Sequence, residues 1–267
     1  MRAIIATAVI TFKQSARDSA FRIVLIVFAA LIIFSTALAM FGLGRQAEMI
    51  REMGLSSLML GGLVVALLSG AGTVIEERHN RTALSTLAKP ISRKQLVAGK
   101  YCGIMLTTAL ALLVLFVVFG VVLANEEGLD ALLGAENGVC QSPLLLEIGK
   151  AVLLIYFEIA LISSIVVGLA LFFSRLATVG ISLAFFALGH LSGGILETCG
   201  IGQSRCALGL PGSLLPRLEF LRIATIVAER QSIVSPTYLL WAAVYTVCGI
   251  VATLAVAMFF FDRRQIY

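Results

Sequence analysis

The sequence predicts an all-α membrane protein that crosses the bilayer six times. Of its 267 residues, 60% are hydrophobic and 13% are charged, and the mean hydropathy is +1.02. A soluble domain is about 45–50% apolar and about 25% charged, so this composition excludes a soluble enzyme. It also excludes a disordered chain, which needs few apolar residues and many charges.

Six long apolar runs predict the membrane-spanning helices. At about 1.5 Å per residue, each run reaches about 31–36 Å, enough to cross a hydrocarbon core about 30 Å thick. Backbone groups in lipid must be satisfied within the segment, and the strands of a barrel would be shorter and would alternate polar with apolar residues. The predicted spans are residues 23–43, 55–75, 101–124, 151–173, 176–196 and 238–261.

The distribution of Lys and Arg predicts that both termini lie in the cytoplasm. With six spans and an inner N-terminus, about 13 of the 20 basic residues fall on the cytoplasmic side. The outer loop 125–143 carries acidic residues and no Lys or Arg. The net charge of +5 is therefore assigned to topology and not to nucleic-acid binding. We expect one transmembrane domain, residues 1–267, in a bacterial-type inner (plasma) membrane.

Two segments outside the spans have amphipathic patterns. In residues 1–20, apolar residues recur at helical spacing and basic residues fall on the opposite side, which predicts a helix in the inner interface. A flexible leader is the alternative. In the outer segment 197–236, apolar residues from Leu214 to Ala228 share one face, which predicts a helix on or within the outer leaflet. An Ala-x-Ala pattern at 37–39 follows the basic leader. The apolar run continues to Leu43, longer than a signal core, so we expect it to stay as a span.

The inner segment 76–100 has a specific predicted shape. Leu84 and Leu87 can share a helix face, and Pro90 ends that helix. Ser92-Arg93-Lys94-Gln95 is a capping box that starts the helix leading into the third span. A loop that only sets topology would need the basic residues alone, whereas the proline and the cap favour a surface for a partner.

This segment resembles the coupling segment of type 2 ABC-transporter permeases. The similarity is greatest to the branch that contains the permease of the nitrous-oxide-reductase maturation transporter, which the outer segment 214–220 also resembles. Where that family often has Gly-Thr before the short helix, this chain has Arg81-Thr82. The matching residues are Glu76 or Glu77, Leu84, Leu87, Pro90, Ile91, Ser92, Arg93, Gly99 and Lys100.

The resemblance implies a homodimer with a separate cytoplasmic ATPase subunit. The ATPase would dock on the coupling residues Arg81, Leu84, Leu87, Pro90, Ser92 and Arg93. No Gly-x-x-x-x-Gly-Lys-Ser/Thr motif occurs in the chain, so ATP is expected on the partner and no cofactor on this chain.

Glu158 and His190 are ionisable residues at predicted membrane depth. Antiparallel packing of their helices would bring them to one level, as a proton-sharing pair or as a structural pair. Gly62, Ala66 and Gly70 form a small-residue face, for packing within the chain or at a dimer seam. Cys199 and Cys206 lie near each other in an outer segment, where an oxidising compartment would allow a disulfide. No metal site is predicted.

The sequence therefore predicts the membrane-spanning permease subunit of an ABC transporter, and not an enzyme. Two alternatives stay open. One is an ABC-type assembly or maturation factor that transports no solute. The other is an integral membrane enzyme acting on lipids or peptides, for which no His-Glu-x-x-His or Gly-x-Ser-x-Gly motif is present.

Overall fold

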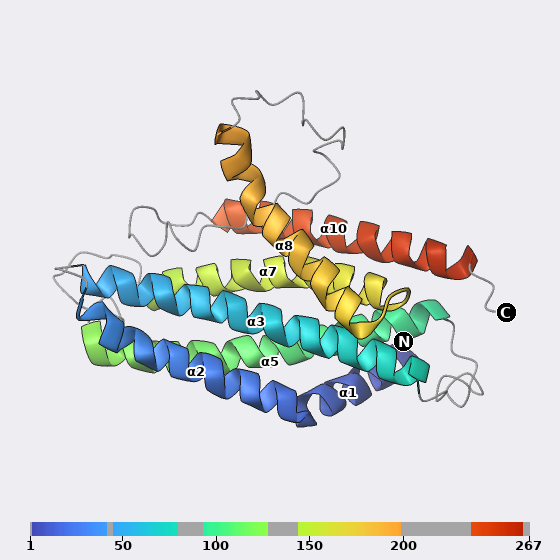
Figure 1. The fold of residues 1–267 in the computed structure, drawn as a ribbon, viewed down its shortest axis with the longest axis horizontal. Helices are drawn as coiled ribbons and strands as arrows, with labels where there is room; N and C mark the ends of the chain where they lie inside the picture. The colour runs from blue at the N-terminus through green and yellow to red at the C-terminus, as the bar shows by residue number, and fades with distance from the viewer. Residues whose placement is uncertain (1, 42–44, 80–92, 128–143, 199–235, 264–267) are drawn as a thin grey trace.

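A computed structural model describes residues 2–41, 45–79, 93–127, 144–198 and 236–263 (Figure 1). Within these ranges the chain forms seven α-helices and no strand. The helices are α1 (Arg2–Arg17), α2 (Ser19–Ala39), α3 (Gln46–His79), α5 (Arg93–Glu127), α7 (Leu144–Ala170), α8 (Arg175–Thr198) and α10 (Pro236–Arg263). The predicted all-α class is confirmed.

Five of these helices are long and apolar enough to cross a membrane: α2, α3, α5, α7 and α10. The chain is therefore a multi-pass membrane protein. The predicted fifth span, 176–196, coincides with α8, but the apolar part described there, Arg175–His190, is shorter than a span. In Figure 1, α8 crosses the bundle obliquely, whereas α2, α3, α5 and α7 run along it. The sixth span stays a prediction.

Helices α3 and α5 are much longer than the apolar runs that predicted them. The second predicted span, 55–75, lies within the 34 residues of α3, and the third, 101–124, within the 35 residues of α5. Each of these helices is about 50 Å long, well beyond a hydrocarbon core of about 30 Å. The helical hydrogen bonds thus continue through the charged residues where an apolar run ends.

The core lies between α3 and its neighbours α2, α5 and α7. Leu58, Leu115 and Phe119 are almost fully buried there. The small-residue face of α3 packs inside the chain: a Cβ on Gly62 would lie 2.6 Å from Ile159 Cδ1 of α7. Close packing of α3 on α7 thus accounts for this face.

Among the described helices, α7 is the one against which α10 packs extensively. Gly249 allows close approach, because a Cβ there would lie 3.1 Å from Leu161 Cδ1. The hydroxyls of Ser164 and Thr253 form a hydrogen bond of 2.6 Å between the two helices. These contacts fix α10 at the edge of the bundle.

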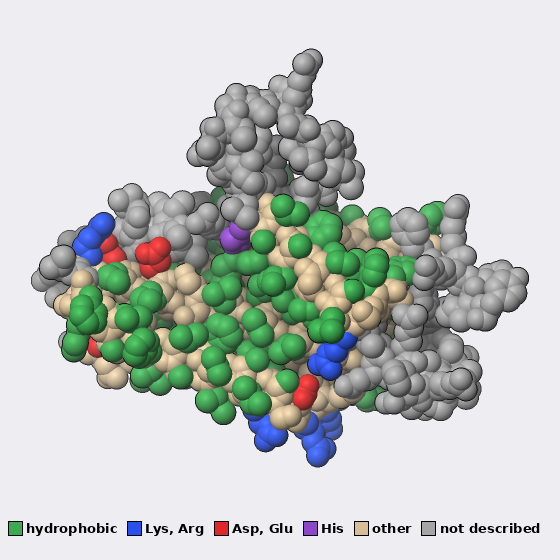
Figure 2. Space-filling model, in the orientation of Figure 1, with side chains coloured by type: hydrophobic (Ala, Val, Ile, Leu, Met, Phe, Trp, Pro, Cys, Tyr) green, Lys and Arg blue, Asp and Glu red, His purple; other side chains and the backbone are tan. Residues whose placement is uncertain are grey.

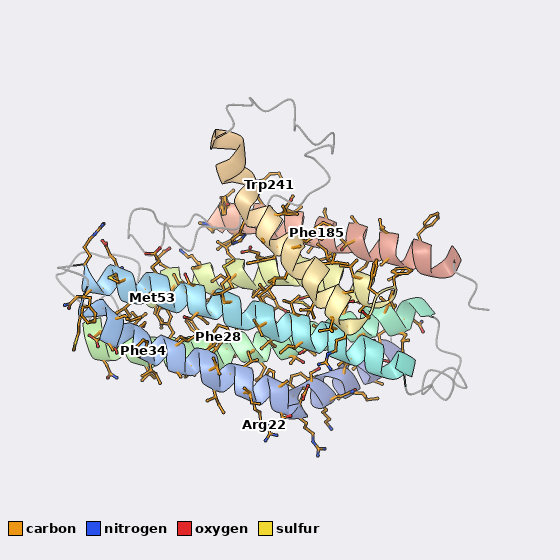
Figure 3. All side chains as sticks on the ribbon, in the orientation of Figure 1. Arg22, Phe28, Phe34, Met53, Phe185 and Trp241 are labelled. Atoms are coloured by element: carbon orange, nitrogen blue, oxygen red, sulfur yellow. The ribbon has the colours of Figure 1, made fainter. Side chains whose placement is uncertain are left out.

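Large apolar side chains cover the outside of the bundle. Figure 2 shows hydrophobic side chains over most of the visible face, with charged side chains at the left end and near the junction of α1 and α2. Phe34, Phe185 and Trp241, marked in Figure 3, are exposed side chains of α2, α8 and α10, and Trp241 is 71% exposed. An exposed apolar surface of this kind is expected to contact the hydrocarbon chains of lipids.

Helix α1 confirms the predicted N-terminal helix. Ala8, Thr11 and Ser15 are buried, whereas the apolar residues Ile5 and Val9 are exposed. The buried face lies on two glycines of α5, because small residues allow the two backbones to approach closely. The exposed apolar residues are then available to lipid, as an interfacial helix requires.

Candidate functional site

Glu158 of α7, which is buried, and His190 of α8, which is partly exposed, form an ionisable pair. Glu158 Oε1 lies 3.4 Å from His190 Nδ1, and the two side chains are 2% and 23% exposed. This is the distance of an ion pair when the imidazole is protonated. Antiparallel packing of their helices was expected to bring these two residues to the same height, and the structure places them in contact. Their role stays a prediction.

A tight turn between α7 and α8 brings the two residues together. The N–H groups of Phe172 and Phe173 both donate to the carbonyl of Leu169 at 2.9 Å, which closes the end of α7. Helix α8 then starts with Thr178 N donating to Ser174 O at 2.9 Å. Glu158 and His190 are about 18 and 22 Å from this turn along their helices, so folding back aligns them.

Glu158 lies near the middle of α7. The helix begins at Leu144, before the predicted start of the fourth span at residue 151, and Glu158 is about halfway along its 27 residues. The Phe186 ring lies 4.6 Å from the His190 ring, centroid to centroid, so the imidazole is flanked by an apolar group. A charge at this position is costly, and a shared proton lowers that cost.

Two buried hydroxyls continue a polar line along α8. Thr178 and Ser182 are fully buried, at helical spacing from Phe186 on the face that meets α3 and α7. Other buried hydroxyls donate to their own helix, such as Thr107 Oγ1 to Gly103 O at 3.0 Å. In the part of the chain that the structure describes, Thr178 Oγ1 and Ser182 Oγ have no hydrogen-bond partner. The sequence alone does not show which Ser and Thr hydroxyls are buried, so these two residues were not predicted.

The pair can share or relay a proton, but it cannot hold a metal by itself. Among the described residues, no three His, Cys, Asp or Glu side chains come close enough to bind a metal ion. Cys102 and Cys248 are free and exposed. The predicted disulfide partners Cys199 and Cys206 lie outside the described residues.

Most of the predicted coupling residues also lie outside the described residues, namely Arg81, Leu84, Leu87, Pro90 and Ser92. Helix α5 begins at Arg93, the position at which the capping box predicts a helix to start. Helix α3 ends at His79 and includes Glu76 and Glu77. The end of α3 and the start of α5 lie at the same end of the bundle (Figure 1).

The first turns of α5 contact three other helices, α1, α3 and α7, at this end of the bundle. Lys100, 5% exposed, donates from Nζ to Thr73 O of α3 at 3.2 Å. Tyr101 Oη donates to Ala160 O of α7 at 3.0 Å. On the opposite side, Gly99 meets Ile4 and Thr7 of α1, because a Cβ there would lie 3.0 Å from Ile4 O. Gly99 and Lys100 belong to the sequence motif, but their packing partners could not be inferred from it.

No family model matches the chain, and no curated protein matches it in sequence.

Proposed function

We propose that this chain is the membrane-spanning permease subunit of an ABC transporter. A separate ATPase subunit docks on segment 81–93 and drives an unidentified substrate across the inner membrane. The observation that carries the proposal is the packed, hydrogen-bonded junction where α3 ends and α5 begins, the two long helices that flank this segment. A bundle without a nucleotide motif of its own must be driven by contact, and this junction is where contact would act.

The junction supports the proposal because it links four helices. The Lys100–Thr73 bond joins α5 to α3, and the Tyr101–Ala160 bond joins α5 to α7. The close approach at Gly99 and Gly103 joins α5 to α1. A displacement of segment 81–93 would therefore move the inner ends of α1, α3, α5 and α7 as one body, since packed interiors transmit displacement with little compression.

Within this proposal each coupling residue has a part. Leu84 and Leu87 occupy an apolar groove of the ATPase, Pro90 fixes the turn, and Arg93 pairs with a carboxylate. Two copies of the chain form a homodimer, each with its ATPase, and both termini face the cytoplasm. The substrate path opens and closes between the copies.

Co-purification from native membranes tests the proposal. Wild-type protein should carry a nucleotide-hydrolysing subunit, and Leu84→Met, which keeps an apolar side chain, should carry it equally. Leu84→Asp should lose it, because a carboxylate left in an apolar groove costs several-fold in affinity or more. Thermal unfolding and elution volume of the Asp variant should match the wild type. A wild-type complex without ATP hydrolysis, or an unaffected Leu84→Asp complex, would show the proposal to be wrong.

A further inference from the structure

A pocket of about 410 Å³ opens where α1 turns into α2, against the side of α3. Its lining has two parts. Phe21, Val24 and Leu68 are apolar lining residues from α2 and α3, where α3 also contributes Ser69 and Thr73. Ser15, Arg17 and Asp18 form a polar end at the junction of α1 and α2. The volume suits a small amphiphilic group.

Ser15 lies at the polar end of this pocket. The residue is among those that line the pocket and is only 4% exposed. Within the described residues its Oγ has no hydrogen-bond partner. The Thr73 hydroxyl at the far side of the pocket donates instead to Ser69 O of its own helix at 2.6 Å. A buried hydroxyl without a partner is costly, so an acceptor supplied by a ligand would be favoured there.

The polar end carries one cation and one anion side by side. Asp18 Oδ1 accepts from Ala20 N at 3.2 Å as the N-cap of α2, which holds the carboxylate in place. Arg17, in the last turn of α1, is exposed and lines the pocket. Arg22, labelled in Figure 3, is also exposed but points away from the bundle. A ligand with a phosphate and an ammonium group would match both charges.

The pocket lies at the boundary between polar interface and hydrocarbon. Charged side chains gather around the junction of α1 and α2 in Figure 2. Directly after this junction, Ile23, Ile26 and Val27 of α2 are exposed apolar side chains that need lipid around them. A headgroup in the pocket would therefore have its acyl chains already at hydrocarbon depth.

We propose that this pocket binds the headgroup of a zwitterionic glycerophospholipid such as phosphatidylethanolamine. The phosphate accepts hydrogen bonds from Arg17 and from Ser15 Oγ, and the ammonium group pairs with Asp18. The glycerol and the first methylenes lie along Phe21, Val24 and Leu68. This site would act whether or not the chain is driven by an ATPase.

Glycine 72 offers a way to block the pocket without disturbing the fold. Gly72 lines the pocket, and a Cβ there would come no closer than 3.6 Å to its nearest neighbour, Arg175 Nη2, which is ordinary contact. Gly72→Leu should therefore fill the cavity. Gly120→Leu on α5 is the matched control, because a Cβ on Gly120 meets nothing within 4 Å.

Native mass spectrometry of the full chain with added phosphatidylethanolamine tests the site. Wild type and Gly120→Leu should bind this lipid equally, and Gly72→Leu should bind about tenfold less. Arg17→Gln should also weaken binding about tenfold, the effect of one lost charge-assisted hydrogen bond. Lys13→Gln removes an exposed charge from the same helix and should change nothing. Full binding by Gly72→Leu, or equal losses for Arg17→Gln and Lys13→Gln, would overturn the proposal.

Two further arms identify the ligand. Asp18→Asn keeps the helix cap, because Asn caps as well as Asp, but removes the anion. It should shift the preference from phosphatidylethanolamine toward phosphatidylglycerol, and an unchanged preference would contradict the assignment of the ammonium group. Soluble glycerophosphoethanolamine should bind far more weakly than the lipid. If it binds equally well, the site takes a free phosphate ester and the lipid assignment is wrong.

Discussion

A carboxyl group near the middle of an apolar helix needs a specific partner. Glu158 is 1% exposed, and a charge at membrane depth costs about 2.5–3.5 kcal/mol or more. The imidazole 3.4 Å away lowers this cost whichever of the two groups holds the proton. The geometry is compatible with a structural pair and with a proton relay, which differ in whether the charge itself is needed.

Glu158→Gln separates these two roles. The amide keeps the size and the hydrogen-bonding oxygen, so the free energy of unfolding in detergent should change by less than about 1 kcal/mol. Glu126→Gln, at an exposed site on α5, is the control for loss of a carboxylate. If the Gln variant folds and also transports at the wild-type rate, the ionisable group has no functional role.

Thr178 gives a second test at the scale of one side chain. Its buried hydroxyl lacks a partner among the described residues, so Thr178→Val should stabilise the protein by up to about 1–2 kcal/mol. Thr107→Val is the matched control, because its hydroxyl bonds to Gly103 O, and it should be neutral or destabilising. Thermal unfolding measures both. A clear loss of stability in Thr178→Val would mean that the hydroxyl holds a bound water or ligand.

At the scale of elements, two glycines decide where α1 lies. A Cβ on Gly103 would be 2.8 Å from the carbonyl oxygen of Ala8 and 2.6 Å from Thr11 Cβ. A backbone atom cannot move aside as a flexible side chain can, so any larger residue must displace α1. The N-terminal helix is thereby fixed to the first turns of α5, beside the segment proposed to receive the ATPase.

Gly103→Ala should therefore destabilise the protein, by about 1–3 kcal/mol for overpacking. Gly120→Ala adds the same methyl group to the same helix in open space, and should stabilise it by up to about 1 kcal/mol through helix propensity. Chemical unfolding of the two variants gives the comparison. Equal effects of the two substitutions would mean that α1 does not rest on α5.

The sequence predicted where helices occur better than how they pack. Apolar runs located α2, α3, α5, α7 and α10, because lipid exposure forces a long apolar stretch into a helix. The runs ended at the first charges, so they missed the extensions of α3 and the last residues of α5, whereas the capping box predicted the start of α5. Residue spacing says nothing of the angle between helices, and so the oblique course of α8 was not predicted. Glu158 and His190 were paired correctly because both are rare at such depth, whereas Ser15 and Thr178 became notable only through their packing.

For the whole molecule, the outward faces set the relation to the membrane. Helices α2 and α10 are little buried and carry large apolar side chains such as Phe34 and Trp241, so the bundle is surrounded by lipid along its length. In the sequence, α5 lies between the predicted coupling segment and the predicted acidic outer loop, whose first residues, 125–127, form the last turn of the helix. The direction of this one helix therefore decides which face an ATPase could reach.

Cysteine accessibility along α5 measures that direction. In a variant without the native cysteines, Lys94→Cys, Val114→Cys and Asn125→Cys place a thiol at the start, the middle and the end of the helix. With intact cells, a membrane-impermeant maleimide should label position 125 and leave position 94 unlabelled until the membrane is opened. Position 114, a partly exposed side chain in the middle of α5, should stay unlabelled in both conditions, because lipid excludes the reagent and suppresses the thiolate. Labelling of position 94 from outside would reverse the topology and remove the coupling segment from the reach of any cytoplasmic ATPase.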